Sequence, residues 1–314
     1  MLASFLTVGQ QVAILFILIG VGFISGKTKF LSDTAVTGMT DFVLYVVTPC
    51  VMVQAFQRDF DANLAGIFAQ AVCFALLTTM VSWGLSHWTL RDSVLERQSV
   101  YRFAAIFSNS GFMALPLEAA LLGPEGLFFG AAYLAVFNIT IWTLGLYIMS
   151  HNKGLLSVKR LLTNPGIIGV FFGLILFFTS TRLPTLLATP VDYLAALNTP
   201  IPMLVIGYHL SHAKLAVVFR DFRSWLCMAE RLIILPLIGL CIGLVMHMDP
   251  TAFVSCMIAL SAPTAAMCTM FSVIYGQDSE LSVSLVSMST LLSILTMPVM
   301  IVLAQTLSGA VIAS

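Results

Sequence analysis

The sequence predicts an all-α polytopic membrane protein in which ten transmembrane helices form two inverted five-helix repeats. Composition, an internal duplication and the placement of charge lead to this fold class. Hydrophobic residues make up 59% of the chain and charged residues only 9%, and the mean hydropathy is +1.01. Soluble domains stay near about 50% apolar residues, so this chain belongs in a lipid bilayer. Its net charge of zero indicates no nucleic-acid partner.

An internal duplication relates the two halves of the chain. Residues 41–52 reappear as residues 192–203, with Asp, Thr, Pro and Met in the same register. Further along, Gly123 matches Gly276 at an offset of 153. A repeat of this length indicates that each half is a structural unit of its own.

Glycines, prolines and charged clusters divide the apolar sequence into ten candidate spans, each near the roughly 20 residues that cross a bilayer. The spans are expected at residues 8–25, 35–55, 63–87, 98–122, 126–149, 164–181, 190–210, 222–247, 251–275 and 280–308. Because each half holds an odd number of spans, the second half enters the membrane from the opposite side. We therefore expect a first repeat at residues 1–152, a cytoplasmic link at 153–163 and a second, inverted repeat at 164–314.

Basic residues are segregated between the loops on the two sides. One side carries only Arg58 and Arg182. The other side carries Lys27, Lys29, Arg91, Arg97, Arg102, Lys153, Lys159, Arg160, Lys214, Arg220 and Arg223. Cytoplasmic loops are enriched in Lys and Arg, so the second side is predicted to be cytoplasmic. Both termini are then external, in a multi-pass protein of the plasma or inner membrane.

The fourth span contains a polar break at its middle. Ser108, Asn109, Ser110, Gly111 and Pro116 interrupt an otherwise apolar segment. Proline removes a backbone donor and clashes with the carbonyl four residues earlier, and glycine tolerates an unwound backbone. Backbone groups freed inside a membrane must face protein or water. The helix is therefore expected to break here, beside a cavity.

The ninth span repeats this break with Ser261, Ala262, Pro263 and Thr264. Matching breaks in inverted halves are typical of secondary transporters, whose substrate site lies where the repeats meet. Helix N-termini carry partial positive charge, so two of them meeting at one point would attract an anion. The competing interpretation is a pair of proline kinks that serve packing alone.

Further polar residues are candidates for the walls of this site. Thr48 and Thr199 precede prolines at corresponding positions, and Asn198 and Asn138 supply amides. The Thr-Pro elements fit a kinked scaffold helix equally well. Glu118, just beyond the first break, is a candidate proton-coupling group, because ionisable residues inside membranes are costly and usually functional. An interfacial position on a short half-helix explains Glu118 equally well.

The other charged residues near the spans have structural interpretations. Asp41 and Asp192 lie near the starts of two spans, where a carboxylate interacts favourably with the helix dipole. Glu230 and Arg231 are expected to extend toward the cytoplasmic surface. His209 and the other histidines fall near span ends, where an interfacial position explains them.

The cysteines do not indicate a metal site or a catalytic site. All six lie in apolar runs, without Cys-x-x-Cys spacing and without a histidine at ligand spacing. They are predicted to be buried small apolar groups. No cofactor and no metal are expected, and the spans carry no His, Asp or Cys constellation of the kind an intramembrane enzyme needs. The chain is therefore not predicted to be an enzyme.

Four segments together resemble the auxin efflux carrier family, which is part of the bile acid/arsenite/riboflavin transporter superfamily. They are residues 109–116, 164–169, 207–210 and 262–264, and the resemblance covers nearly the whole chain. It implies a fold similar to sodium/proton antiporters and bile acid symporters. In that fold spans 1, 2, 6 and 7 form a scaffold. Spans 3 to 5 and 8 to 10 form a transport domain that contains the two crossed helices.

The resemblance also implies a substrate class and a mechanism. Bacterial members are similar to permeases for malate, malonate and related acids, and plant members move indole-acetic acid. The carboxylate would lie at the crossing near Asn109, and an elevator-like movement would carry it across. Met267 stands where members often have an asparagine, which favours a more apolar or monovalent anion. Family scaffolds often dimerise, so a homodimer is expected.

These observations predict a uniporter or proton-coupled carrier of small organic carboxylates. Its substrate-binding candidates are Ser108, Asn109, Ser110, Gly111, Pro116, Ser261, Ala262, Pro263, Thr264, Met267, Thr48, Asn198, Thr199 and Asn138. A sodium-coupled symporter of the bile acid type is the alternative, although acidic residues that would bind sodium are scarce. A seven-span receptor conflicts with the number of spans.

Overall fold

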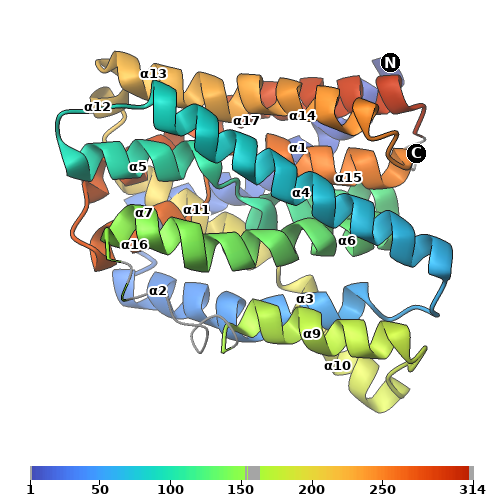
Figure 1. Ribbon diagram of the computed structural model, residues 1–314. Coiled ribbons are helices and arrows are strands. Elements are labelled where there is room, and N and C mark those ends of the chain that lie inside the picture. Colours follow the sequence, from blue (N-terminus) through green and yellow to red (C-terminus); the bar gives the residue numbers. More distant parts are fainter. Residues whose placement is uncertain (1, 153, 155–162, 311–314) are drawn as a thin grey trace.

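The computed structural model describes residues 2–152, 154 and 163–310, and these residues are almost entirely helical (Figure 1). Within this part of the chain the extended backbone pairs only between Ser108 and Thr264. The helices of the first half are α1 (Leu2–Lys27), α2 (Asp33–Phe42), η1 (Val43–Val47), α3 (Thr48–Ala55), α4 (Ala62–Thr89), α5 (Leu95–Ile106), η2 (Ser110–Ala114), α6 (Leu115–Thr140), η3 (Ile141–Gly145) and α7 (Leu146–Ser150), where η marks a π-helical turn.

The second half begins with α9, which follows Asn164, whose side chain caps the helix by accepting from the amide of Ile167. Its helices are α9 (Pro165–Phe178), α10 (Thr185–Ala196), α11 (Pro200–His212), α12 (Ala216–Phe219), α13 (Phe222–Ala229), η5 (Glu230–Ile234), α14 (Leu235–Val245), α15 (Pro250–Ser261), α16 (Met267–Ile274) and α17 (Ser279–Ser308). The link expected at 153–163 lies outside the described residues, apart from residues 154 and 163.

Six helical segments among the described residues are long and apolar enough to cross a membrane. They are Phe5–Lys27, Asp33–Ala55, Ala62–Thr89, Ser110–Ser150, Phe222–Val245 and Ser279–Ser308. Two shorter apolar helices, α9 and α15, accompany them. The chain is therefore an all-α, multi-pass membrane protein.

Prolines explain several interruptions of the long helices. Three helices begin directly after a π-helical turn and have a proline as their second residue. These prolines are Pro49, Pro116 and Pro236. Proline cannot donate a backbone hydrogen bond and clashes with the carbonyl four residues earlier. The wider π turn accommodates that clash without ending the segment.

Two helix pairs pack at backbone contact distance through glycines. α1 lies against α11, and α3 lies against α9. A side chain at Gly207 of α11 would place its Cβ 2.0 Å from the carbonyl oxygen of Ile19, and one at Gly169 of α9 would place its Cβ 2.8 Å from the Cα of Pro49. In Figure 1, α9 and α10 lie with α2 and α3 in a layer of their own.

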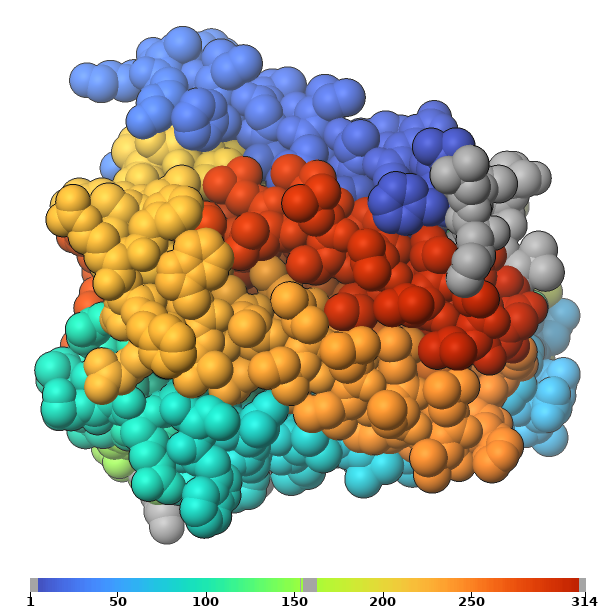
Figure 2. Space-filling view, turned by 90° about the horizontal axis from the view of Figure 1, so that it is seen from above, coloured from blue at the N-terminus to red at the C-terminus, as the bar shows by residue number. Residues whose placement is uncertain are grey.

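The remaining helices form a second body around α15. This helix packs against α4, α6, α14 and α17, and every residue from 252 to 261 is buried. Figure 2 shows α17 on one face of the molecule, between α1 and the segment formed by α13 and α14. The first turns of α1 and the last turns of α17 lie at the same end of the bundle (Figure 1).

Two glycines that match in the duplication share an unusual backbone conformation. Gly123 has φ +63° and Gly276 has φ +64°. Side chains rarely tolerate this region of the Ramachandran map, whereas glycine adopts it readily. Gly123 interrupts α6, and Gly276 follows the end of α16.

The two aspartates expected at helix starts lie elsewhere. Ser32 caps the start of α2, which places Asp41 near the end of that helix. α10 begins at Thr185, so Asp192 lies well inside it, where its carboxylate accepts a hydrogen bond of 2.7 Å from the amide of Gln54. The prediction of a capping role was wrong because both helices begin several residues earlier than expected.

Candidate functional site

The two predicted breaks lie against each other. Their extended segments pair in antiparallel orientation at Ser108 and Thr264. The amide of Asn109 donates to the carbonyl of Pro263 at 2.7 Å, and the amide of Ala265 donates to the carbonyl of Phe107 at 2.9 Å. We call this pairing of residues 107–109 with 263–265 the crossing. It satisfies backbone groups that the breaks leave without helical partners.

Four helix ends meet at the crossing. α5 and α15 end there, and the helical segments that begin with η2 and α16 start there. The first amides of a helix have no acceptor within that helix. At η2 these amides belong to Ser110, Gly111 and Phe112, and at α16 they lie near Met267. The crossing therefore presents two N-terminal ends, each with partial positive charge.

Unpartnered polar side chains surround these ends. The side-chain nitrogen of Asn109 is buried and has no hydrogen-bond partner among the described residues, and the residue is only 4% exposed. The hydroxyls of Ser110 and Ser261 are also buried without partners in this part of the chain. An unpaired buried polar group costs about 1 to 3 kcal/mol. Of these three residues, Asn109 also lines a cavity, so its side-chain nitrogen is accessible to a ligand.

A small inner cavity of about 40 Å³ opens beside Asn109. It brings together five of the predicted site residues: Thr48, Asn109, Gly111, Asn138 and Met267. The amide nitrogen of Asn138 donates to the carbonyl of Leu134 at 3.0 Å, and the hydroxyl of Thr48 donates to that of Val43 at 2.9 Å. Of the two asparagine amides that line this cavity, that of Asn109 has no hydrogen-bond partner among the described residues.

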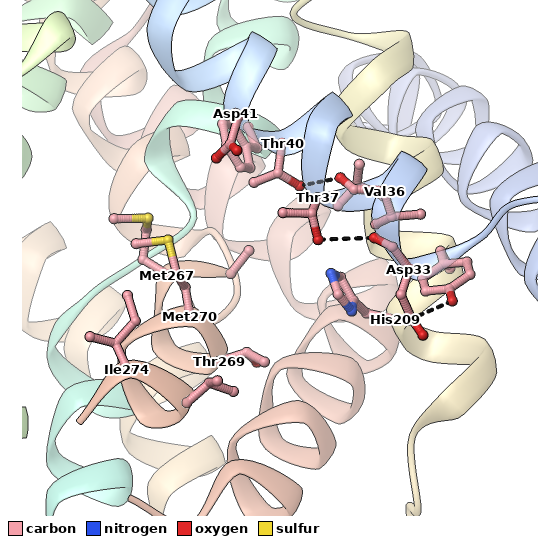
Figure 3. Close-up of a pocket in the computed structure, with 15 residues that line it drawn as sticks. Asp33, Val36, Thr37, Thr40, Asp41, His209, Met267, Thr269, Met270 and Ile274 are labelled. Atoms are coloured by element: carbon pink, nitrogen blue, oxygen red, sulfur yellow. Dashed lines mark hydrogen bonds between the residues drawn. The ribbon is translucent and has the colours of Figure 1, made fainter. Parts of the chain in front are cut away.

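The inner cavity adjoins a larger vestibule of about 310 Å³ (Figure 3). Phe112, Ala266 and Met267 line both spaces. On one wall α2 contributes Asp33, Val36, Thr37, Thr40 and Asp41, and α11 contributes Val205, Tyr208 and His209. The opposite wall carries Thr269, Met270 and Ile274 of α16 (Figure 3), and Val273 of the same helix also lines the vestibule. The vestibule therefore lies between α2 and α11 on one side and α16, which follows the second break, on the other.

Sequence reasoning missed this vestibule. His209 was expected at the interface, yet it faces the vestibule together with Asp33, whose carboxylate accepts a 2.7 Å hydrogen bond from the hydroxyl of Tyr208. The signal was present at residues 207–210, which served only to identify a family resemblance. Their role as a cavity wall depends on the position of α11 opposite α16.

A third cavity, of about 150 Å³, lies on the other side of the broken helix. It includes Pro116, Asn198 and Thr199 among the predicted residues, and also Gln54 and Asp192. The amide of Asn198 donates to the carbonyl of Gly111 at 3.2 Å. This contact ties the segment before α11 to the start of η2. The predicted residues thus divide between two sides of the crossing.

The other predicted residues lie within the crossing and line none of these three cavities. Ser108, Ser261, Ala262 and Pro263 are buried in the paired segments, with Thr264 beside them. The hydroxyl of Thr264 donates to the carbonyl of Ala104 at 3.1 Å, and its amide donates to the hydroxyl of Ser289 at 3.2 Å. Thr264 therefore holds the two breaks together and leaves little capacity for a ligand.

Glu118 is fully buried, at 0% exposure, and both of its carboxyl oxygens lack partners among the described residues. The carboxyl group packs directly over Gly130, where a Cβ would lie 1.5 Å from Oε2. It lines none of the three cavities. A carboxyl group buried without a partner is costly, so Glu118 is an unusual feature of this segment.

The position of Arg231 differs from the one expected from the sequence. It was expected to extend to the cytoplasmic surface with Glu230, but both side chains are buried and Arg231 is 0% exposed. Its guanidinium donates to the carbonyl oxygens of Ala105, Ile106 and Leu260, at the ends of α5 and α15. Arg231 lies about 14 Å along the span, at 1.5 Å per residue. Because the surface is hard to reach from this depth, its position in the sequence could have indicated a buried side chain.

Comparison with known proteins agrees with this architecture. Residues 7–301 match the family model described as "Membrane transport protein". The chain is 26% identical to an "Uncharacterized transporter" of Methanothermobacter thermautotrophicus, over 92% of this chain and 96% of that protein. It is 23% identical to a "Putative malonate transporter" of Rhizobium meliloti, over 90% of this chain and 91% of that protein.

A third relative shows the same pattern. It is an "Uncharacterized transporter" of Methanocaldococcus jannaschii, 22% identical over 90% of this chain and 94% of that protein. The family match covers nearly the whole chain, including both breaks and the vestibule. The chain therefore belongs to the membrane transport protein family, the auxin efflux carrier family that its motifs resemble.

Proposed function

We propose that this protein is a secondary transporter of small organic carboxylates, which bind at the crossing. The observation that carries the proposal is the unpartnered amide of Asn109, which lines a cavity at two helix N-termini. Amide donors and helix N-termini recognise carboxylates, as they do other anions. The name of one relative, "Putative malonate transporter", supports the same substrate class.

We further propose ten membrane crossings in two inverted repeats, at residues 1–152 and 164–314. The segment Ser110–Ser150 has 41 residues, so as a helix it would extend about 62 Å. This length is twice the roughly 30 Å of a hydrocarbon core, and Gly123 bends it into two passes. The matching conformations of Gly123 and Gly276 support the repeat, as do the pairs α1–α11 and α3–α9, each of which joins the two halves.

In this topology both termini are external, and the vestibule opens to the cytoplasm of the cell. The scaffold comprises α1, α2, α3 and α9 to α11, and the transport domain comprises α4 to α7 and α13 to α17. The vestibule lies between these two domains. An elevator-like movement of the transport domain would carry the crossing from the vestibule toward the external side, where Asn198 and Thr199 lie. A scaffold of this kind fits a homodimer.

Transport is proposed to be uniport or proton-coupled, with Glu118 as the proton carrier in the second case. Glu118 is buried in the proposed transport domain, and movement of that domain would have to open it to water. The alternative is a sodium-coupled symporter of the bile acid type. The unpartnered hydroxyls of Ser110 and Ser261 are the groups that favour it, because oxygen ligands bind sodium.

Uptake into proteoliposomes tests the proposal. Radiolabelled malonate, malate and indole-acetate would be supplied with a pH gradient and a sodium gradient imposed separately. Saturable uptake of at least one acid supports the proposal, and the effective gradient identifies the coupling ion. Folded protein that moves none of these acids under either gradient would contradict it. With a pH gradient, loss of coupling in Glu118→Gln but continued downhill uptake would assign the proton to Glu118.

A further inference from the structure

The guanidinium of Arg231 joins the two broken helices at their C-terminal ends. It donates to the carbonyl oxygens of Ala105 at 2.9 Å and Ile106 at 3.0 Å, at the end of α5, and to the carbonyl oxygen of Leu260, at the end of α15. Arg231 itself belongs to a third element, η5. One side chain thus reaches the C-terminal ends of both half-helices.

The charges of these groups balance. Each helix C-terminus is equivalent to about −0.5 of an elementary charge, so the ends of α5 and α15 together contribute about −1. An arginine stays protonated in proteins and contributes one positive charge. Among the residues that the structure describes, no carboxylate forms an ion pair with Arg231. The two helix ends are therefore its principal counter-charge.

This balance leaves the opposite pair of helix ends uncompensated. The N-termini at η2 and α16 together carry about +1 by the same reasoning. The inner cavity between them is lined by Thr48, Asn109, Asn138 and apolar residues, and no acidic or basic side chain lines it. Without Arg231, the negative ends of α5 and α15 would cancel the positive ends beside them.

We infer that Arg231 is a positioning residue that makes the crossing electropositive and matches it to a ligand with a single carboxylate. The inference rests on the proposed function and adds to it the sign and the size of the substrate charge. A second carboxylate on the same molecule finds no further cation in the inner cavity. The site therefore favours monoanions over neutral analogues and gains little from a second negative charge.

The test compares three ligands that share one skeleton and differ in charge. Malonate, monomethyl malonate and dimethyl malonate would be titrated into the protein in nanodiscs, at a pH where both free carboxyl groups are ionised. Wild type is expected to bind the monoester at least about tenfold more tightly than the neutral diester, as a partly buried helix-dipole interaction allows. Malonate is expected to bind no more tightly than the monoester.

Two substitutions separate charge from geometry. Arg231→Met removes the charge, and the preference for the monoester over the diester is expected to fall close to one. Arg231→Lys keeps the charge but loses the planar fork, so the preference stays within about threefold of wild type while thermal stability drops. Arg102→Met is the matched control, because Arg102 donates to the carbonyls of His87 and Leu90 at the end of α4, away from the crossing.

The outcomes distinguish this inference from the proposed function. A folded Arg231→Met protein that keeps the wild-type preference would show that Arg231 only ties the helices together. If Arg231→Met does not fold, Arg231→Lys decides, and loss of the preference in that folded variant overturns the role of charge. Wild type that does not distinguish the three ligands overturns the proposed carboxylate site and this inference with it.

Discussion

The α1–α11 contact and the crossing use opposite kinds of packing. Between α1 and α11 the backbones touch, because a Cβ at Gly22 would lie 2.2 Å from the carbonyl oxygen of Leu204 and one at Gly207 would lie 2.0 Å from that of Ile19. At the crossing, by contrast, the side-chain nitrogen of Asn109 and the hydroxyl of Ser110 have no partner among the described residues. The first region has no space for a larger side chain, whereas the second has polar groups without a hydrogen-bond partner among the described residues. The comparison separates residues that pack the fold from residues whose polar groups are proposed to bind a ligand.

The largest expected effect is on the α1–α11 contact. Gly207→Val would force backbone atoms apart, and overpacking of this kind costs about 1 to 3 kcal/mol or more. We expect little folded protein, measured by size-exclusion chromatography and thermal unfolding in detergent. Gly20→Val is the matched control, because a side chain at Gly20 of α1 would meet nothing within 4 Å. Equal stability of the two variants would contradict the packing account.

The next largest effect concerns binding at the crossing. Asn109→Ala removes a donor to the proposed carboxylate, and a hydrogen bond to a charged group contributes about 1.5 to 3 kcal/mol. Malonate affinity is expected to fall about 10- to 100-fold, while thermal stability stays the same or rises. Asn138→Ala is the control from the same cavity, because its amide already donates to Leu134. A similar loss in both variants would mean that the unpaired amide has no special role.

A smaller effect tests the backbone symmetry of the two halves. Gly123→Ala would force alanine into a conformation with positive φ, which costs about 1 to 3 kcal/mol. Nothing lies within 4 Å of a Cβ at either Gly123 or Gly276, so the cost in each case comes from the backbone alone. Gly276→Ala should lower the free energy of unfolding by a comparable amount. If one substitution is neutral in thermal unfolding, the two positions are not equivalent.

The smallest expected effect is on stability and concerns Asp221, which caps the start of α13. Burial raises the pKa of Asp221, but hydrogen bonds from Tyr101 and the amide of Arg223, with the charge of Arg97, lower it more, so the net pKa lies below its ordinary value of 3.8. Asp221 therefore stabilises the folded protein at neutral pH. This contribution disappears as the pH falls through the lowered pKa.

Asp221→Asn keeps an oxygen that can cap α13 but removes the charge that pairs with the partly exposed Arg97. It should therefore reduce stability at pH 7 by about 0.2 to 1 kcal/mol. The difference between wild type and variant should shrink below about pH 4, where the unfolded-state carboxyl takes up a proton. Thermal unfolding as a function of pH measures it. A difference that stays constant down to pH 3 would exclude a role for the carboxylate charge.

The breaks could be predicted because they depend on local chemistry. Glycine and proline weaken a helix wherever it packs. The structure interrupts the helices at residues 107–109, just before Gly111, and at residues 262–266, which include Pro263, whereas Pro116 lies inside α6 after a π-helical turn. That the two breaks meet was expected from their matching positions in the two halves, but the residues that pair were not. The hydrogen bonds of the pairing join Asn109 to Pro263, 154 positions apart, and no local rule specifies such a contact.

Other features could not be predicted, because they depend on where the helices start and on contacts between distant segments. Asp41 and Asp192 were expected to be caps, but Ser32 and Pro184 stand at the caps instead. Arg231 was expected at the surface because an arginine in a membrane usually finds water. Arg231 instead donates to carbonyl groups that lack helical partners because α5 and α15 end beside it. Its role could therefore not be derived from its own segment.

The central claim is that a carboxylate binds at the crossing, at the N-termini of η2 and α16. An electron cryo-microscopy structure with bound malonate tests it most directly. We predict ligand density in the inner cavity, with a carboxylate oxygen within hydrogen-bond distance of the side-chain nitrogen of Asn109. Density that lies only in the vestibule, or none at a malonate concentration that saturates transport, would contradict the account.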